Sequence, residues 1–245
     1  MSVSLAAAAA RLFMDPVLAV VFPSFCPVCA RVLDHPTRGP LCDACWEALP
    51  RHQGALCRCG LPLPPTLTLC GRCRRDRQPF AGGASLGPYE GGLREAIHAL
   101  KYRGRRRVAA RLAAVLLEEP RARAVLAQAE VLVPVPLHPR RRRERGFNQA
   151  ELLAGAVGRQ CLLPVAATAL VRRKDTVPQA GLSAAGRRLN VAGAFGVRRR
   201  ARIAGRVVVL VDDVFTTGAT ALACARALRE AGAREVRLLA IARVV

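Results

Sequence analysis

One segment near the carboxyl end of the chain combines carboxylates, hydroxyls and a glycine in an order that suits a phosphorylated ligand. An apolar run over Val207–Val211 leads into Asp212 and Asp213, a short loop follows, and a helix-like stretch runs from Ala221 to Ala231. Glycine lets the backbone approach a phosphate, hydroxyls and consecutive amides donate to its oxygens, and a helix N-terminus favours its negative charge. The candidate phosphate-binding residues of the loop are Thr216, Thr217, Gly218, Ala219 and Thr220.

The acidic pair predicts the sugar side of the same ligand. Carboxylates at a strand end can accept hydrogen bonds from ribose hydroxyls, directly or through a bound Mg²⁺, whereas a buried and unpaired carboxylate pair is costly. Asp212 and Asp213 are therefore the candidate catalytic residues. The loop has neither the Gly-Lys-Ser/Thr of a nucleoside triphosphate loop nor the three spaced glycines of a dinucleotide fold. A plain strand-to-helix turn capped by threonine is the simpler alternative.

Eight of the ten cysteines fall into four close pairs between residues 26 and 73. Two thiolates a few residues apart can bind one metal ion from a tight turn, and two such pairs complete the four-sulfur shell that Zn²⁺ accepts. A disulfide framework is the alternative, but it is typical of exported proteins. The candidate metal ligands are Cys26, Cys29, Cys42, Cys45, Cys57, Cys59, Cys70 and Cys73.

These eight thiolates predict one or two structural zinc sites, because a structural site uses four ligands and leaves no open position for catalysis. We favour sequential closure, in which the first two pairs form one site and the last two the other; interleaved pairs are the alternative. Cys57 and Cys59 are separated by one residue where the other pairs have two, so the second site is the less regular one. Cys161 and Cys224 stand alone in helical patterns, as buried apolar cysteines do.

The composition sets limits on the class of protein. The chain has 245 residues, of which 52% are hydrophobic, and this excludes a disordered or collagen-like chain. No stretch approaches the ~20 apolar residues of a membrane-spanning helix. The first charge, Arg11, follows the apolar run Leu5–Ala10 rather than preceding it as in a signal peptide. We therefore expect a cytoplasmic protein with no transmembrane segment.

The charge is strongly positive. The chain has 39 Lys and Arg against 17 Asp and Glu, a net charge of +22, and most of the excess follows residue 78. Such a field attracts polyanions, either nucleic acid or a multiply phosphorylated small molecule. Only two of these cations are lysines, so part of the excess reflects an arginine bias, and a solvated arginine-rich surface is the alternative.

Helix-like and strand-like segments alternate from about Phe80 onward, which predicts an α/β domain with a largely parallel sheet. Apolar residues recur at helical spacing over 93–100 and 112–116, and short aliphatic runs over 131–135, 207–211 and 236–241 predict buried strands. We expect an N-terminal helical lead-in over 1–25, a double zinc ribbon over 26–78 and the α/β domain over 79–245.

The acidic pair and its loop resemble the phosphoribosyl pyrophosphate (PRPP) motif of type I phosphoribosyltransferases. The paired cysteines, the segment Tyr89–Tyr102, the run Val133-Pro-Val-Pro-Leu137 and the segment Arg145-Gly-Phe-Asn-Gln149 are similar to the ComF family of competence-associated proteins, and the match covers nearly the whole chain. The resemblance implies a type I phosphoribosyltransferase-like fold, a mainly parallel twisted sheet flanked by helices, preceded by a small Cys-rich zinc-ribbon module.

The resemblance also assigns roles to individual residues. The loop Thr216–Thr220 corresponds to the binding site of the ribose 5-phosphate, and the acidic pair to the ribose contacts. The residues that correspond to the pyrophosphate loop follow the predicted strand over 131–135 and include Pro136, Leu137 and His138.

Arginines follow this loop at once, at Arg140–Arg143 and Arg145. Guanidinium groups suit diphosphate oxygens, while a nucleic-acid patch and a merely solvated run are alternatives. Arg145 and Asn148 are the better candidates, because the glycine, phenylalanine and asparagine that follow Arg145 do not result from an arginine bias. We expect Asn148 at a helix N-cap.

Residues 172–195 interrupt the alternation of strands and helices, and in related folds such a segment covers the active site. Gln179, Arg187 and Asn190 are therefore further candidates, with an exposed polar helix as the alternative. Arginines around 172–188 and 198–202 could widen the site into a track for a longer polyanion.

Together, the resemblance implies PRPP binding and Mg²⁺-dependent transfer of a ribose 5-phosphate group, in which the growing charge on the leaving pyrophosphate needs Mg²⁺ and cationic side chains. Enzymes for 6-oxopurines have an aspartate where this chain has Thr216, so that subclass is disfavoured. The alternative is a single-stranded nucleic-acid binding factor in transformation that uses the fold as a non-catalytic scaffold. The family's association with DNA uptake adds single-stranded DNA and competence-machinery proteins to the candidate partners.

Overall fold

The computed structural model describes residues 24–35, 39–75, 79–174 and 193–244. The chain divides into two compact units, the first formed by Met1–Pro50 with Glu90–Val108 and the second by Arg51–Tyr89 with Ala109–Val245. Each unit thus contains one half of the cysteine-rich segment.

The first unit packs its cysteine-rich half against a helix. Its elements are α2 (Asp43–Glu47) and α4 (Gly91–Tyr102), and α4 covers the predicted helical spacing over 93–100. Leu41 and Leu49 lie so close to α4 that a Cβ on Gly92 would be 2.8 Å from Leu49 Cδ2. Arg105 adds a hydrogen bond from its guanidinium to the carbonyl of Gly39, at 3.0 Å.

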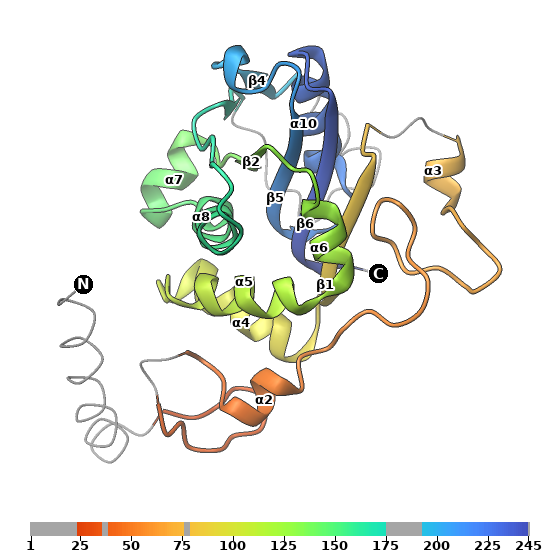
Figure 1. The fold of residues 1–245 in the computed structure, drawn as a ribbon. Helices are drawn as coiled ribbons and strands as arrows, with labels where there is room; N and C mark the ends of the chain where they lie inside the picture. The colour runs from red at the N-terminus through yellow and green to blue at the C-terminus, as the bar shows by residue number, and fades with distance from the viewer. Residues whose placement is uncertain (1–23, 36–38, 76–78, 175–192, 245) are drawn as a thin grey trace. The chain divides into compact units, whose positions relative to one another are not determined.

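The second unit is built on a four-stranded parallel sheet (Figure 1). The strand order is β1 (Gly82–Pro88), β6 (Glu235–Arg243), β5 (Val207–Phe215) and β2 (Val131–Pro134). The three strands predicted from aliphatic runs are therefore confirmed. The central strands β5 and β6 are almost wholly buried, which explains why both read as continuous apolar runs.

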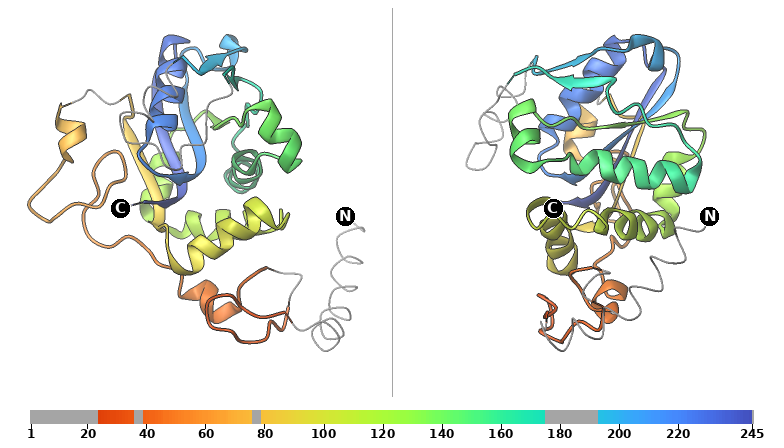
Figure 2. Two further views of the ribbon diagram at one scale, coloured as in Figure 1. Left: turned by 180° about the vertical axis from the view of Figure 1, so that it is seen from behind. Right: turned by 90° about the vertical axis from the view of Figure 1, so that its left-hand side faces the viewer.

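Helices cover both faces of this sheet (Figure 2). The buried side of α10 (Ala219–Glu230), including Cys224 and Leu228, packs with Val208 and Leu210 of β5. On the other face, α8 (Gln149–Cys161) lies against β2, where a Cβ on Gly158 would be 3.5 Å from Leu132 Cδ1. The remaining helices of the described chain are α3 (Gly71–Arg75), α5 (Val108–Glu118), α6 (Pro120–Leu126), α7 (Pro139–Arg145) and the 3₁₀ turn η1 (Arg200–Arg202).

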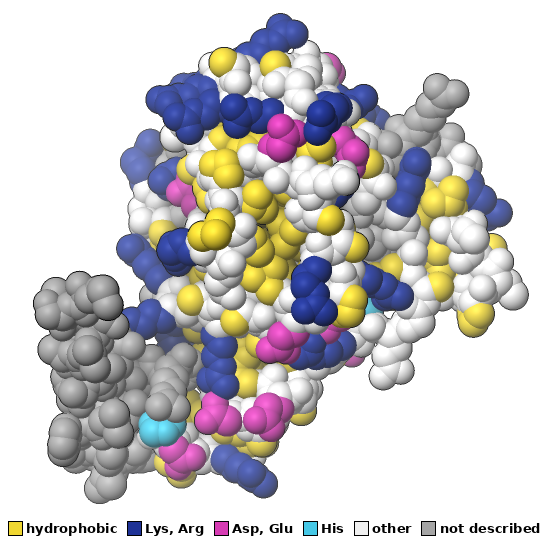
Figure 3. Space-filling view, in the orientation of Figure 1, with side chains coloured by type: hydrophobic (Ala, Val, Ile, Leu, Met, Phe, Trp, Pro, Cys, Tyr) yellow, Lys and Arg dark blue, Asp and Glu magenta, His cyan; other side chains and the backbone are white. Residues whose placement is uncertain are grey.

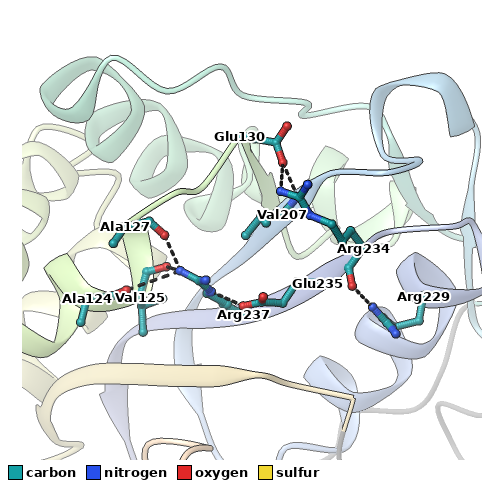
Figure 4. Close-up of polar contacts among 9 residues, drawn as sticks. All are labelled: Ala124, Val125, Ala127, Glu130, Val207, Arg229, Arg234, Glu235 and Arg237. Atoms are coloured by element: carbon teal, nitrogen blue, oxygen red, sulfur yellow. Dashed lines mark hydrogen bonds and ion pairs between the residues drawn. The ribbon is translucent and has the colours of Figure 1, made fainter.

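Arginines fasten the amino-terminal edge of the sheet, as Figure 4 shows. Arg237 of β6 donates to the carbonyl of Val125 at 3.1 Å and pairs with Glu235 of its own strand. Arg234 pairs with Glu130 at 2.9 Å. These contacts hold α6 and the start of β2 to β6.

A two-stranded antiparallel hairpin of β3 (Leu170–Arg172) and β4 (Phe195–Val197) stands between α8 and β5 in the sequence. Its two strands flank the interruption that the sequence predicts over 172–195, most of which lies outside the described residues. Gln179, Arg187 and Asn190 lie outside the described residues. Among the helices that the structure describes, we find none with the length and apolar character needed to cross a bilayer.

Candidate functional site

Two of the predicted loops follow neighbouring strands. β2 and β5 are parallel partners, and Val135 continues their pairing with a hydrogen bond from its amide to the carbonyl of Val211, at 2.9 Å. The loop after β2 contains Pro136–His138, and the loop after β5 contains Thr216–Gly218. Because the carboxyl ends of parallel strands meet at one edge of the sheet, both loops lie at the edge where such folds bind ligands.

The acidic pair lies inside β5 rather than after it. Asp212 and Asp213 are adjacent in the strand, so their side chains point to opposite faces of the sheet. Asp212 is half-buried on the α10 side, where burial and the charge of Asp212 together raise the pKa of the Cys224 thiol. Asp213 is 4% exposed, and its Oδ1 accepts a hydrogen bond from the amide of Val214 at 2.9 Å.

The phosphate loop turns at Gly218, which has φ +76° and is the N-cap of α10. The first hydrogen bond of the helix runs from the amide of Leu222 to the carbonyl of Gly218, at 2.8 Å. Amides ahead of that bond have no acceptor within the helix, and they point toward the N-terminal end. Thr216 is exposed, while Thr217 and Thr220 are half-buried. The predicted order of strand, loop and helix is therefore present.

Asn148 connects the pyrophosphate-loop candidates to α8. It is the predicted N-cap, with its Oδ1 accepting from the amide of Ala150 at 3.0 Å. Its Nδ2 donates to the carbonyl of Val135 at 3.0 Å, one residue before Pro136, and the side chain is 2% exposed. Asn148 therefore fixes where the loop leaves β2. His138 has a similar local function, since it is the N-cap of α7.

A cavity of about 510 Å³ opens beside this loop. Arginines from three segments line it, and the only acidic residue in its lining, Glu151, is paired with Arg142 at 2.6 Å. The lining contains eight residues that the sequence analysis proposed, Pro136, Leu137, His138, Asn148, Arg142, Arg172, Arg173 and Arg198, together with Pro139, Glu151, Ala167, Thr168, Leu170 and Val171. The cavity is thus a cationic recess at the predicted pyrophosphate loop.

The lining of this cavity differs from the predicted site in two ways. Arg145 is not in its lining; the guanidinium of Arg145 instead donates to Oε1 of Gln149, at 2.7 Å. The wall that contains Ala167 and Thr168 gave no sequence signal, because small residues between two elements carry no recognisable chemistry. The antiparallel strands β3 and β4 also contribute Arg172 and, directly after β4, Arg198 to the same lining.

The cysteines form two clusters of four, and in each the sulfur atoms lie within 4.8 Å of one another. Sequential closure is confirmed, and interleaved pairs are excluded by this grouping. The ten cysteines are all free thiols, so the disulfide alternative is not supported. The clusters are Cys26, Cys29, Cys42 and Cys45 in the first unit, and Cys57, Cys59, Cys70 and Cys73 in the second. Four sulfurs at this separation fit a structural zinc site.

The irregular pair closes because of a tight turn. Gly60, with φ +80°, donates its amide to the carbonyl of Cys57 at 2.7 Å, and the amide of Cys57 donates to the carbonyl of Leu61. The turn reverses the chain directly after Cys59, which brings its sulfur back beside that of Cys70, at 3.8 Å. A single intervening residue is therefore compatible with a complete second cluster.

Each cluster has one thiol that ionises readily. Burial opposes ionisation of Cys26, but hydrogen bonds from backbone amides, that of Cys42 foremost, outweigh it and lower the pKa to about 6. Burial likewise opposes ionisation of Cys70, while hydrogen bonds led by the amide of Cys73 lower its pKa to about 7. In contrast, burial raises the pKa of Cys45. Because metal ions bind thiolates, Cys26 and Cys70 are the first sulfurs available to a metal.

Comparison with known families matches both parts of the chain. Residues 17–74 match the double zinc ribbon domain, and residues 148–244 match the phosphoribosyl transferase domain. The second match includes α8, the hairpin, the acidic pair and the phosphate loop.

Full-length relatives agree with this assignment. The chain is 34% identical over 227 residues to the DNA utilization protein YhgH of Escherichia coli (strain K12), covering 91% of this chain and 98% of the relative. It is 31% identical over 214 residues to Competence protein F of Haemophilus influenzae (85% and 93%) and 28% identical over 199 residues to Competence protein ComFC of Bacillus subtilis (78% and 79%). The chain therefore belongs to the ComF family, which joins a double zinc ribbon to a phosphoribosyltransferase domain.

Proposed function

We propose that the chain binds PRPP at the carboxyl edge of its sheet and transfers the ribose 5-phosphate group from it in a Mg²⁺-dependent reaction that releases pyrophosphate. The observation that carries this proposal is the pairing of β2 with β5. It brings a cationic cavity at one strand end beside an acidic pair and a phosphate loop at the next. A ligand with a phosphate on one side of a sugar and a diphosphate on the other matches that arrangement.

Each part of the ligand has a chemical counterpart in the site. The amides and hydroxyls of Thr216–Thr220 bind the 5-phosphate at the N-terminus of α10. Because Asp212 and Asp213 point to opposite faces of β5, one carboxylate can accept directly from a ribose hydroxyl and the other through a bound Mg²⁺. The loop Pro136–His138 and the arginines of the cavity bind pyrophosphate. Carboxylate and diphosphate oxygens are also the ligands that Mg²⁺ prefers, so the acidic pair fits a magnesium ion that arrives with PRPP.

In the transfer, the bond between ribose C1 and the pyrophosphate oxygen breaks as the acceptor attacks C1. Negative charge grows on pyrophosphate and positive charge on the ribose ring. The arginines stabilise the first, and the carboxylates of β5 stabilise the second. Asp212 is half-buried and Asp213 is buried, and charge interactions in such a partly desolvated setting are stronger than in water.

Isothermal titration calorimetry with PRPP and Mg²⁺ tests the proposal. Replacing Asp212→Asn and Asp213→Asn, singly and together, should weaken binding by about 10- to 100-fold for each charge-assisted hydrogen bond removed. Glu230→Gln is the matched control, since Glu230 is an exposed carboxylate at the opposite end of α10. The proposal is wrong if the unmodified protein does not bind PRPP, or if the double variant binds it as tightly.

A second candidate function is binding of single-stranded DNA. Lys and Arg side chains gather around β4 and η1 in Figure 3, and exposed arginines at 198–200 continue from the cationic cavity. Relatives that carry the names DNA utilization protein and competence protein agree with such a ligand, and proteins of a DNA-uptake machinery are then candidate partners.

We also propose that the protein acts in the cytoplasm, because free thiols in both cysteine clusters suit a reducing compartment.

A further inference from the structure

The second cysteine cluster (Cys57, Cys59, Cys70 and Cys73) is packed directly on the sheet of the second unit. The backbone of Cys59 lies so close to β1 that a Cβ on Gly83 would be 3.0 Å from the carbonyl carbon of Cys59. Gly60 also contacts Gly83, since a Cβ on Gly60 would be 3.4 Å from the carbonyl group of Gly83. The two glycines in contact let the metal-binding turn touch the backbone of β1.

Arg243, the last residue of β6, makes a specific contact with this turn. Its guanidinium donates from Nη1 to the carbonyl oxygen of Cys59 at 2.7 Å, and the residue is 6% exposed. The backbone of Arg243 is also fixed, since its carbonyl accepts from the amide of Tyr89 at 2.8 Å. A guanidinium cannot lose its charge. It therefore needs acceptors such as the Cys59 carbonyl to remain buried.

The same guanidinium stacks on the residue that precedes the phosphate loop. Its central carbon lies 4.3 Å from the ring centroid of Phe215, the last residue of β5 and the partner of Arg243 in the sheet register. Phe80 packs its edge against the same ring, with centroids 6.5 Å apart. The ring of Phe215 in turn lies against the loop, because a Cβ on Gly218 would be 2.5 Å from Phe215 Cζ. Phe215 is 5% exposed and forms the floor of the Gly218 turn.

We propose that Arg243 is a positioning residue that couples the second metal cluster to the phosphate loop, so that metal binding at Cys57, Cys59, Cys70 and Cys73 orders Thr216–Thr220. The contacts run from the carbonyl of Cys59 to the guanidinium of Arg243, then to the ring of Phe215 and to Gly218. Without the metal, the turn at Cys59 is no longer held by four sulfurs, and the carbonyl of Cys59 is no longer a fixed acceptor for the guanidinium. The ring and the loop are then without their support. The effect on ligand affinity rests on the proposed function, whereas the ordering of the loop does not.

Hydrogen–deuterium exchange of the loop amides in the ligand-free protein tests the coupling directly. Removing the metal from the unmodified protein, or replacing Arg243→Met, should speed exchange in a peptide covering residues 216–222 by about tenfold or more. The matched control is Arg237→Met. Arg237 is on the same strand, has a side chain that is 15% exposed and also donates to a backbone carbonyl, but it lies at the opposite end of β6 (Figure 4). It should leave exchange in the loop unchanged.

A thermodynamic cycle separates coupling from general destabilisation. If Arg243 transmits the effect, metal removal should add less than about twofold to loop exchange in the Arg243→Met variant. Full additivity of the two changes, or no change in loop exchange on metal removal, would overturn the inference. Gly83→Ala provides a second test should Arg243→Met fail to fold. It displaces Cys59 without altering a ligand or the arginine, and should also speed loop exchange.

Calorimetry with PRPP and Mg²⁺ then relates the coupling to the ligand. Arg243→Met should weaken binding about tenfold, and Arg237→Met should not weaken it. If the unmodified protein does not bind PRPP while the exchange results hold, the proposed function fails and the coupling stands. If PRPP binds but its affinity does not depend on Arg243 or on the metal, the proposed function stands and the coupling to the ligand is wrong.

Discussion

At the scale of single residues, Gly218 is restricted in two independent ways. Its φ of +76° is unfavourable for other residues, and its Cα faces the ring of Phe215. We predict that Gly218→Ala lowers the free energy of unfolding by about 2 kcal/mol and strongly weakens PRPP binding, because the backbone strain and the collision both disturb the loop. Urea denaturation and calorimetry measure these two effects.

Gly82→Ala is the matched control for that change. Gly82 is in β1, has no positive φ, and a Cβ there meets no atom within 4 Å. It should change the unfolding free energy by less than about 0.5 kcal/mol. An equally small effect at Gly218 would contradict the role of the Phe215 ring.

The sequence predicted a glycine in this loop that lets the backbone approach a phosphate. It could not predict the ring, since Phe215 reaches the turn only when β5 is extended beyond the apolar run.

Asn148 offers a second test at this scale, because its amide group makes two different hydrogen bonds. Asn148→Ala removes both the cap of α8 and the contact with the Val135 carbonyl, and should cost about 2–3 kcal/mol of unfolding free energy. Asn148→Ser can still cap the helix but is too short to reach Val135, so about half of that cost is expected. Equal losses for the two variants, measured by urea denaturation, would show that the cap contributes nothing. The N-cap was predictable from local sequence, whereas the contact with Val135 depends on the packing of α8 against β2.

At the scale of elements, the cysteine pairs show how much local spacing can predict. Four sulfurs per site follow from the pairing of the cysteines, whereas the spacing allowed one or two sites and only favoured sequential closure over interleaved pairs. The structure confirms sequential closure. The complete second cluster did not follow, because the turn at Gly60 that accommodates Cys57 and Cys59 depends on backbone geometry. The strand β5 gives a similar lesson. It extends through Asp212 and Asp213 because β6 pairs with it as far as Phe215.

Two complete clusters predict two zinc ions per chain. Metal analysis of reduced protein should give about two zinc ions per chain. The double variant Cys57→Ser, Cys59→Ser should bind one, because the first cluster keeps its ion. Cys161→Ser is the matched control, since Cys161 lies in neither cluster. A ratio that stays at two in the double variant would place the second ion elsewhere.

Metal uptake should also depend on pH in a different way at each cluster. A lowered pKa means that the thiolate persists to a lower pH, and Cys26 has a pKa of about 6 while that of Cys70 is about 7. As the pH falls, protons compete with zinc for all four thiols of a cluster, so zinc uptake by metal-free protein should weaken at the second cluster before it weakens at the first. Titrating zinc into the unmodified protein and the Cys57→Ser, Cys59→Ser variant between pH 5 and 8 compares the two. Identical pH profiles would contradict this order.

At the scale of the whole chain, the net charge of +22 is distributed among different tasks. Arg237 and Arg234 fasten the amino-terminal edge of the sheet, Arg243 holds the turn of the second cluster, and Arg105 supports the first unit. None of these roles could be predicted from composition, because they depend on which backbone carbonyls the fold brings near each guanidinium. The arginines that the nucleic-acid alternative would use are those in the lining of the cavity and the exposed arginines at 198–200.

This distribution makes the nucleic-acid alternative testable against the PRPP proposal. If single-stranded DNA binds along the cavity, then Arg172→Gln with Arg173→Gln should weaken oligonucleotide binding for every sequence. The slope of log affinity against log salt should also become shallower by about 0.7 for each DNA phosphate that is no longer neutralised. Arg226→Gln is the control, since Arg226 is an exposed arginine of α10 outside the cavity lining.

The Asp212→Asn, Asp213→Asn variant discriminates between the ligands. Removal of two negative charges should strengthen the binding of DNA or leave it unchanged, while it weakens the binding of PRPP. Fluorescence anisotropy from about 50 to 300 mM salt measures both, and a slope unchanged by the arginine substitutions would exclude the cavity as the DNA site.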